Sequence, residues 1–195
     1  MLKFGNVVIT RGFWLTLVIS LMMGAAEVLP LIAVAVLLHE MGHLLALRVF
    51  GISVEVIYFT AFGVEMRADT RFIPYWQELV CTLAGPGMNI LAALFLSRLA
   101  EDYLLAGTNI LQGVFNLLPL TGLDGSRALY LMISWLIDPV CADRVCCFVE
   151  LVCALLLVAC SLYLTVCCGT GGFLLLAVIG IFINIWREIF AKQLA

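Results

Sequence analysis

The sequence predicts an all-α polytopic membrane protein with about six transmembrane helices, one of them broken midway, and a membrane-associated β-hairpin near residues 52–69. Hydrophobic residues make up 65% of the 195 residues and charged residues 12%, with a mean hydropathy of +1.18, so polar groups cannot cover the surface. Apolar runs of about 18 residues or more are typical of spanning helices. Six runs lie near residues 12–29, 31–50, 76–98, 104–137, 145–167 and 171–190. We expect one transmembrane domain over residues 1–195, without a separate soluble regulatory domain.

Basic residues predict the orientation of these helices, because short loops rich in lysine and arginine stay in the cytoplasm. They precede the first run and follow the second and sixth, as Lys3, Arg11, Arg48, Arg67, Arg71, Arg187 and Lys192. Acidic residues, Glu101 and Asp102, follow the third run. We therefore expect a multi-pass protein of the cell membrane with both termini in the cytoplasm. A cleaved signal peptide ending near Gly24 and Ala26 is the alternative for the first run, but the next apolar helix begins soon after, at Pro30.

The stretch from Ile52 to Asp69 carries the pattern that predicts the hairpin. Apolar and polar residues alternate in its two halves, 54–56 and 64–69, and residues 61–63 between them can form a turn. An ordinary interfacial loop explains the same pattern equally well. The hairpin and the loop therefore both stay open at this point.

The second apolar run contains the two histidines of the chain, His39 and His43. Their spacing of four residues places both imidazoles on one helix face, where they can bind one metal ion. Glu40 lies about 100° around the helix from His39 and flanks the metal, in the position of a general base for a bound water. A chance match on a polar helix patch is the alternative. An ionisable group in a membrane span costs a few kcal/mol, however, which favours a functional site.

Catalytic zinc usually takes three protein ligands, so a further ligand is expected elsewhere in the chain. Asp124 is the best candidate, because it lies in a polar interruption of the fourth run. Pro119 and Gly122 in the same interruption break the helix, and a broken helix at membrane depth must be buried in protein or line a wet cavity. A role of Asp124 as a helix cap, paired with Arg127, is the alternative and is compatible with metal binding.

Asn116 belongs to the same polar interruption. Its amide can hold a substrate carbonyl or an oxyanion. Satisfying the carbonyls that Pro119 frees is an equally good explanation.

Other features of the chain argue against further roles. The net charge of −3 and the dispersed basic residues predict no nucleic-acid binding. Four of the eight cysteines recur every seven residues, as Cys146, Cys153, Cys160 and Cys167, which predicts a packing stripe of small residues on one helix. A non-catalytic membrane protein, either a metal-ion carrier or a scaffold, is the competing function, although the runs offer few polar residues for an ion path.

The polar motifs together resemble the site-2 protease family of intramembrane zinc metalloproteases. The matching segments are His39-Glu40-Met41-Gly42-His43, Ala84-Gly85-Pro86-Gly87-Met88-Asn89, Asn116-Leu117-Leu118-Pro119 and Leu123-Asp124-Gly125, in family order. The six-span plan is similar to the stage IV sporulation protein FB branch. This resemblance implies one Zn²⁺ ion on His39, His43 and Asp124, Glu40 as general base, and Asn116 as a catalytic or substrate-contacting residue.

The resemblance also suggests how a substrate is bound. A transmembrane substrate must be unwound locally, and an edge strand of the predicted hairpin, beginning at Gly63 and Val64, can add it as a further strand. With the amino terminus inside, the second run brings His43 into the cytoplasmic half of the membrane. We therefore expect cleavage of membrane-associated proteins near the cytoplasmic face, with release of a product such as a transcription factor in sporulation-type proteolysis. Lipid and inhibitory or regulatory membrane proteins are the other expected partners.

Overall fold

The computed structural model describes residues 2–4, 6–22, 24–60, 63–70 and 73–168, in two compact units, Met1–Asn116 and Leu117–Ala195. The predicted sixth span at 171–190 lies outside the described residues, as do three of the basic residues used for the orientation, Arg71, Arg187 and Lys192. That the two units act as one protease domain stays a prediction.

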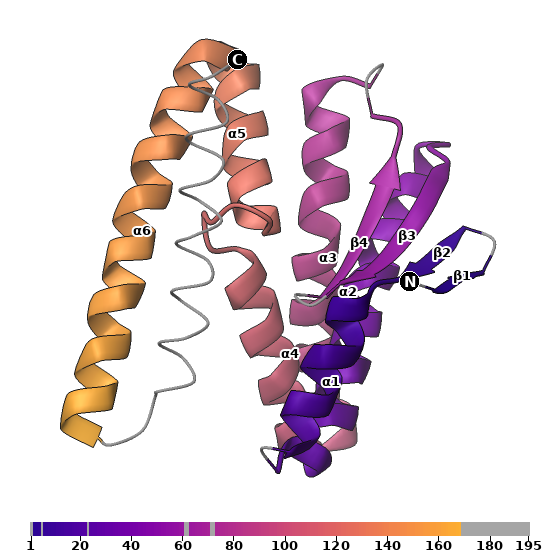
Figure 1. Cartoon of the computed structure of the whole chain (residues 1–195). Helices are drawn as coiled ribbons and strands as arrows, with labels where there is room; N and C mark the ends of the chain where they lie inside the picture. The colour runs from indigo at the N-terminus through magenta and orange to yellow at the C-terminus, as the bar shows by residue number, and fades with distance from the viewer. Residues whose placement is uncertain (1, 5, 23, 61–62, 71–72, 169–195) are drawn as a thin grey trace. The chain divides into compact units, whose positions relative to one another are not determined.

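The first unit is built from helices and a small sheet (Figure 1). Its helical elements are α1 (Arg11–Met22), η1 (Ala25–Glu27), α2 (Leu29–Val49), α3 (Tyr75–Phe95), the π-helical turn η2 (Leu96–Ala100) and α4 (Tyr103–Asn116). Pro30 lies in the first turn of α2, where a missing backbone N–H costs nothing. Each of the helices α2, α3 and α4 contacts the other two, so the three form the helical core of this unit.

The close approach of α3 to α2 and to α4 depends on glycine. A Cβ atom added at Gly42 would overlap the backbone carbonyl of Ala84, and one added at Gly113 would come within 3.2 Å of the Cβ of Asn89. Small residues at such contacts let helix backbones approach in a membrane, where no hydrophobic force drives helices together. Gly42, which lies between His39 and His43 in the sequence, therefore lets α2 pack closely against α3.

Four strands form one sheet in the order β1-β2-β3-β4, comprising β1 (Leu2–Phe4), β2 (Val7–Ile9), β3 (Val54–Thr60) and β4 (Gly63–Ala68). β3 and β4 pair antiparallel in the segment where the sequence favoured either a hairpin or a loop, and β2 pairs with β3 in parallel. The fold is therefore mostly helical, and the all-α prediction missed β1 and β2. That the β3–β4 pair lies in the membrane stays a prediction.

The second unit contains α5 (Asp124–Leu136) and α6 (Pro139–Cys168), preceded by residues 117–123. These seven residues interrupt the fourth apolar run, so the predicted helix break is confirmed. Leu120 is fully buried and packs with Ala154 of α6, and the Glu150 side chain of α6 accepts hydrogen bonds from the backbone N–H and the hydroxyl of Thr121. An apolar contact and an acidic side chain of α6 thus hold the segment that leads into Asp124.

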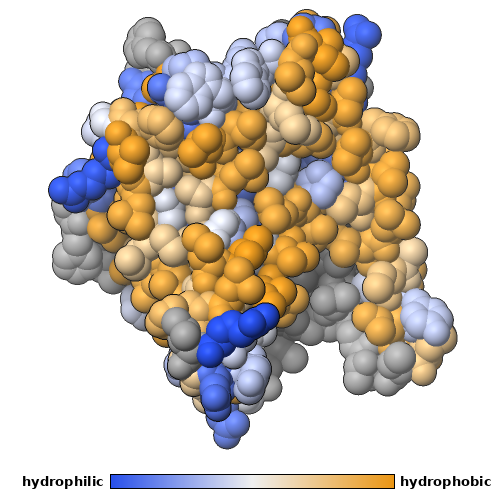
Figure 2. All heavy atoms as spheres, turned by 180° about the vertical axis from the view of Figure 1, so that it is seen from behind, coloured by the Kyte–Doolittle hydropathy of each residue, from blue (hydrophilic) through white to orange (hydrophobic). Residues whose placement is uncertain are grey.

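Among the described residues, three helices are long and apolar enough to cross a membrane: Leu29–Val49, Tyr75–Arg98 and Pro139–Cys167. They match the predicted second, third and fifth spans. The predicted first span is a helix of only 12 residues, shorter than the roughly 20 residues that a crossing needs, and the predicted fourth span is two helices of 14 and 13 residues. Large hydrophobic residues cover most of the surface in Figure 2, as expected where lipid is the solvent.

The cysteine repeat does not form the buried face of α6. Cys160 and Cys167 are exposed, whereas the buried residues of this helix are Ala142, Ala154 and Ser161. The heptad spacing placed the cysteines on one face correctly, but smaller residues on another face make the contacts. The predicted packing stripe is therefore wrong for Cys160 and Cys167.

We predict that Glu150→Leu loosens the segment before Asp124. Removing the acceptor leaves the Thr121 N–H without its partner, and hydrogen bonds to a charged group contribute about 1.5–3 kcal/mol. Hydrogen exchange measured by mass spectrometry should become faster in peptides that cover residues 117–123. Thr165→Val, which removes a hydroxyl bonded to the Ser161 carbonyl on the same helix, is the control. Unchanged exchange in the Glu150 variant would contradict the prediction.

Candidate metal centre

The two histidines of α2 point their Nε2 atoms at one another. The distance between His39 Nε2 and His43 Nε2 is 3.2 Å, and the ring planes are nearly perpendicular, at 84°. Two nitrogens that each bind one tetrahedral zinc at 2.0–2.1 Å stand about 3.3–3.4 Å apart. The spacing of the pair therefore agrees with two ligands converging on one ion.

Hydrogen bonds at the other ring nitrogens decide which nitrogen can bind a metal. His43 Nδ1 lies 2.8 Å from the backbone carbonyl of Cys81, which can only accept, so this nitrogen carries the proton. His39 Nδ1 donates in the same way to Asn89 Oδ1 at 2.7 Å. In its neutral form, each ring then presents a lone pair at Nε2. Two lone pairs this close repel unless a cation lies between them, so the residues fit a zinc ion.

Gly85 of α3 makes the space that the His43 ring occupies. A Cβ atom added at Gly85 would overlap the His43 imidazole, including its Nε2 atom. Pro86, which follows it inside α3, is fully buried and cannot donate a helical hydrogen bond. The Ala-Gly-Pro segment of α3 thus provides the contact surface for the metal-binding face of α2.

The remaining predicted site residues lie on four different elements. Glu40 is half-buried on α2 between the histidines, and Asn116 is the last residue of α4, where its Nδ2 donates to the Gln112 carbonyl at 3.0 Å. Asp124 is the first residue of α5 in the second unit, and Leu123 rather than Asp124 holds the N-cap position. Gly63 and Val64 begin β4, the last strand in the order of the sheet.

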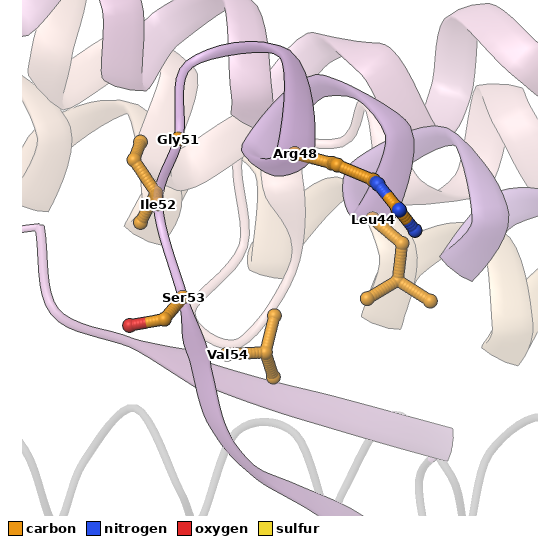
Figure 3. A pocket seen from close by; sticks show the side chains of 6 residues that line it. All are labelled: Leu44, Arg48, Gly51, Ile52, Ser53 and Val54. Carbon is orange, nitrogen blue, oxygen red and sulfur yellow. The ribbon is translucent and has the colours of Figure 1, made fainter.

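An open pocket of about 440 Å³ lies at the carboxyl end of α2 (Figure 3). Its lining comes from the last turns of the helix and the start of β3: Leu44, Arg48, Gly51, Ile52, Ser53 and Val54. His39, Glu40 and His43 are not among the lining residues. This pocket adjoins the metal-binding helix but is not the metal centre.

Several residues that support the centre were not predicted as site residues. Asn89 and the Cys81 carbonyl hold the histidines, Gly85 accommodates one ring, and Asn109 contacts Asn89. A signal was present for the two asparagines, because each is a polar residue inside an apolar run and both are completely buried. No sequence signal identifies a backbone carbonyl as a partner.

A histidine pair with an adjacent glutamate, carried on a helix of membrane-spanning length, is the arrangement typical of HExxH metalloproteases. Residues 27–101, which include α2, β3, β4, α3 and η2, match the model of peptidase family M50.

The chain is 30% identical to a zinc metalloprotease of Methanocaldococcus jannaschii over 115 residues, which are 53% of this chain and 33% of the relative. It thus spans about a third of that relative's length. It is also similar to the solved structure of a site-2 protease from Methanocaldococcus jannaschii, with a TM-score of 0.70 and 22% identity, covering 96% of this chain and 93% of that one. At this identity, the structural likeness concerns the fold.

We predict that Gly85→Ala weakens metal binding, because the added methyl group displaces the His43 ring. Zinc affinity, measured in detergent by competition with a chelator, should fall about 10–100-fold, the range found when support of a metal ligand is lost. Gly87→Ala is the matched control, since a Cβ there meets no atom within 4 Å. Equal zinc affinity of the two variants would mean that the ring does not depend on this space.

Proposed function

We propose that this chain is an intramembrane zinc metalloprotease that hydrolyses peptide bonds of membrane-associated or transmembrane proteins near the cytoplasmic face. The observation that carries the proposal is the pair of Nε2 atoms 3.2 Å apart, with both Nδ1 atoms bonded to acceptors and Glu40 beside them. Ionisable groups inside a membrane helix are costly to bury, which favours a functional role for this arrangement. The match of residues 27–101 to a peptidase family supports the same activity.

The proposed metal is one Zn²⁺ ion held by His39, His43 and Asp124. Two imidazoles and one carboxylate form a common ligand set of catalytic zinc sites, which leaves one position for water. Asp124 lies at the first position of α5, directly after the helix break, and the Leu120 and Thr121 contacts with α6 restrict the segment before it. A fixed backbone around a ligand favours metal binding because less motion is lost on coordination.

The residues of the chain have separate proposed roles. Bound zinc would supply a Lewis acid that polarises the scissile carbonyl and lowers the pKa of water to about 7. Glu40 takes the proton of the attacking water and returns it to the leaving amine. One N–H of the Asn116 amide donates to the Gln112 carbonyl. Its second N–H donates to the substrate oxygen on which negative charge develops.

The proposed substrate site is the edge of β4, beginning at Gly63 and Val64. In the first unit β4 pairs with β3, as Val64 with Phe59 and Gly63 with Thr60, and it is the last strand in the sheet order. A strand in this position can pair with an extended peptide through main-chain hydrogen bonds. Such pairing would hold a locally unwound transmembrane segment in the conformation that hydrolysis requires.

The remaining parts of the proposal concern the cell. A multi-pass arrangement with both termini in the cytoplasm follows from the basic residues and places cleavage in the cytoplasmic half of the bilayer. The product would then be a cytoplasmic fragment, for example a transcription factor, with inhibitory membrane proteins controlling access. Neither relative found is named for sporulation, so the proposal concerns regulated proteolysis in general rather than that branch.

Glu40→Gln should keep the metal and lose the chemistry, because glutamine cannot accept the proton. We expect zinc content to stay at the parent level and cleavage of a membrane-anchored reporter to fall at least about 100-fold, the usual contribution of a general base. Cleavage can be followed by gel analysis of protein reconstituted in liposomes. A Glu40→Gln variant that cuts as fast as the parent would exclude this mechanism. If the parent protein binds zinc but does not cut the reporter, a metal-ion carrier or a scaffold is favoured instead.

Asp124→Ala should lower zinc retention, since only two protein ligands would remain. Zinc in purified protein, measured by inductively coupled plasma mass spectrometry, should fall from about one ion per chain to well below half. Asp138→Ala is the control, because this carboxylate of the same unit instead accepts from the Cys141 N–H at the start of α6. Undiminished zinc in the Asp124 variant would remove Asp124 from the ligand set.

A further inference from the structure

A buried amide, Asn89 of α3, is the node of a polar chain that crosses the first unit. Its Nδ2 donates to the Ala35 carbonyl of α2 at 2.9 Å and to Asn109 Oδ1 of α4 at 2.9 Å, and its Oδ1 accepts from His39 Nδ1 at 2.7 Å. A backbone carbonyl can only accept, so the amide nitrogen must face Ala35. The orientation of Asn89, and with it the proton on His39 Nδ1, is therefore determined.

The far end of this chain is fixed in the same way. Asn109 is completely buried, and its Nδ2 donates to the Leu105 carbonyl one turn earlier in α4 at 2.9 Å. Its Oδ1 is therefore the atom that faces Asn89. Four groups are thus joined by hydrogen bonds donated in one direction, from His39 of α2 through Asn89 of α3 and Asn109 of α4 to the Leu105 carbonyl.

The alternative arrangement shows what Asn109 contributes. A rotation of the Asn89 amide by 180° about its Cβ–Cγ bond would exchange Oδ1 and the NH₂ group. Oδ1 would then face two acceptors, the Ala35 carbonyl and Asn109 Oδ1, and the NH₂ group would face His39. That arrangement would favour the other tautomer of His39, with the proton on Nε2 where a metal must bind. Without Asn109, the rotated form meets one repulsive contact instead of two, and the native form loses one hydrogen bond in a buried site.

The two histidines differ in this respect. His43 Nδ1 is held by a backbone carbonyl, that of Cys81, which no substitution at that position removes. His39 depends on two side chains in sequence. A change at Asn109 should therefore act on one ligand and leave the other in place.

We propose that Asn109 is a positioning residue of the metal centre, which acts through Asn89 to hold His39 with its Nε2 lone pair directed at the metal. This inference rests on the proposed zinc site. None of the segments that resemble the protease family includes Asn109. Its burial and its two hydrogen bonds of normal length carry the inference.

The test compares zinc and cobalt binding by the full chain in detergent. Asn109→Leu has a similar size and suits an apolar helix, so the fold should persist while the acceptor for Asn89 is lost. We expect zinc affinity, measured by chelator competition, to fall about tenfold, at the lower end of the effect of outer ligand support. The visible spectrum of bound Co²⁺ should also change. Thr108→Val, the neighbouring α4 residue whose hydroxyl bonds to the Leu104 carbonyl, should leave both unchanged.

Asn109→Asp separates positioning from packing, because it keeps an acceptor oxygen of the same shape in place. Its zinc affinity should lie closer to that of the parent than to that of Asn109→Leu. Equal losses in the Asp and Leu variants, or no loss in the Leu variant, would overturn the inference. If the parent itself binds no zinc, the proposed function fails instead.

A second measurement needs no variant. Nitrogen-15 NMR of the zinc-free parent, labelled at histidine, should show His39 with its proton on Nδ1. A proton on Nε2 of His39 would contradict the proposed chain of hydrogen bonds whether or not the Leu variant folds.

Discussion

The structure depends on the need to hold two metal-binding imidazoles inside an apolar helix. Each ring has one nitrogen for the metal and one that must find a partner, since an unsatisfied polar group in this environment costs several kcal/mol. Both partners come from α3, as the Cys81 carbonyl and Asn89. The two helices must therefore approach closely, which explains why Gly42 and Gly85 stand where a methyl group would meet the opposite helix. The metal site and the helix contact satisfy one requirement together.

The sequence was sufficient for the long helices and for the break in the fourth run. Hydropathy alone predicted α2, α3 and α6, and Pro119 with Gly122 indicated the interruption before α5. It was insufficient for short elements. β1 and β2 contain three residues each, too few for a period of two to be recognised, and β2 pairs with a strand about fifty residues later. The first predicted span was also too long, because hydropathy gives no sign that the helix ends at Met22.

The centre itself was only partly predictable, because motifs identify ligands and not the groups that orient them. His39 and Glu40 were recognised from a spacing of a few residues along one helix. The partners of the centre are separated from it by 50 residues at Asn89 and by 38 at Cys81, and Glu150 lies 29 residues from Thr121. Such contacts exist only once helices have packed. Buried polar residues in apolar runs, such as Asn109, are the trace that these contacts leave in the sequence.

The unequal lengths of α1 and α2 have a consequence for the depth of the sheet. β2 leads directly into α1, which descends about 18 Å over 12 residues before the chain turns at η1 and α2 returns over 21 residues, about 32 Å (Figure 1). α2 thus extends about 14 Å beyond the level at which β2 joins α1, and β3 runs back to pair with β2. Counting back about nine residues from Val49 reaches Glu40, between the two histidines. The start of α1, joined to the sheet through the parallel pairing of β2 with β3, is therefore level with the histidine-bearing turn of α2 and not with the end of that helix.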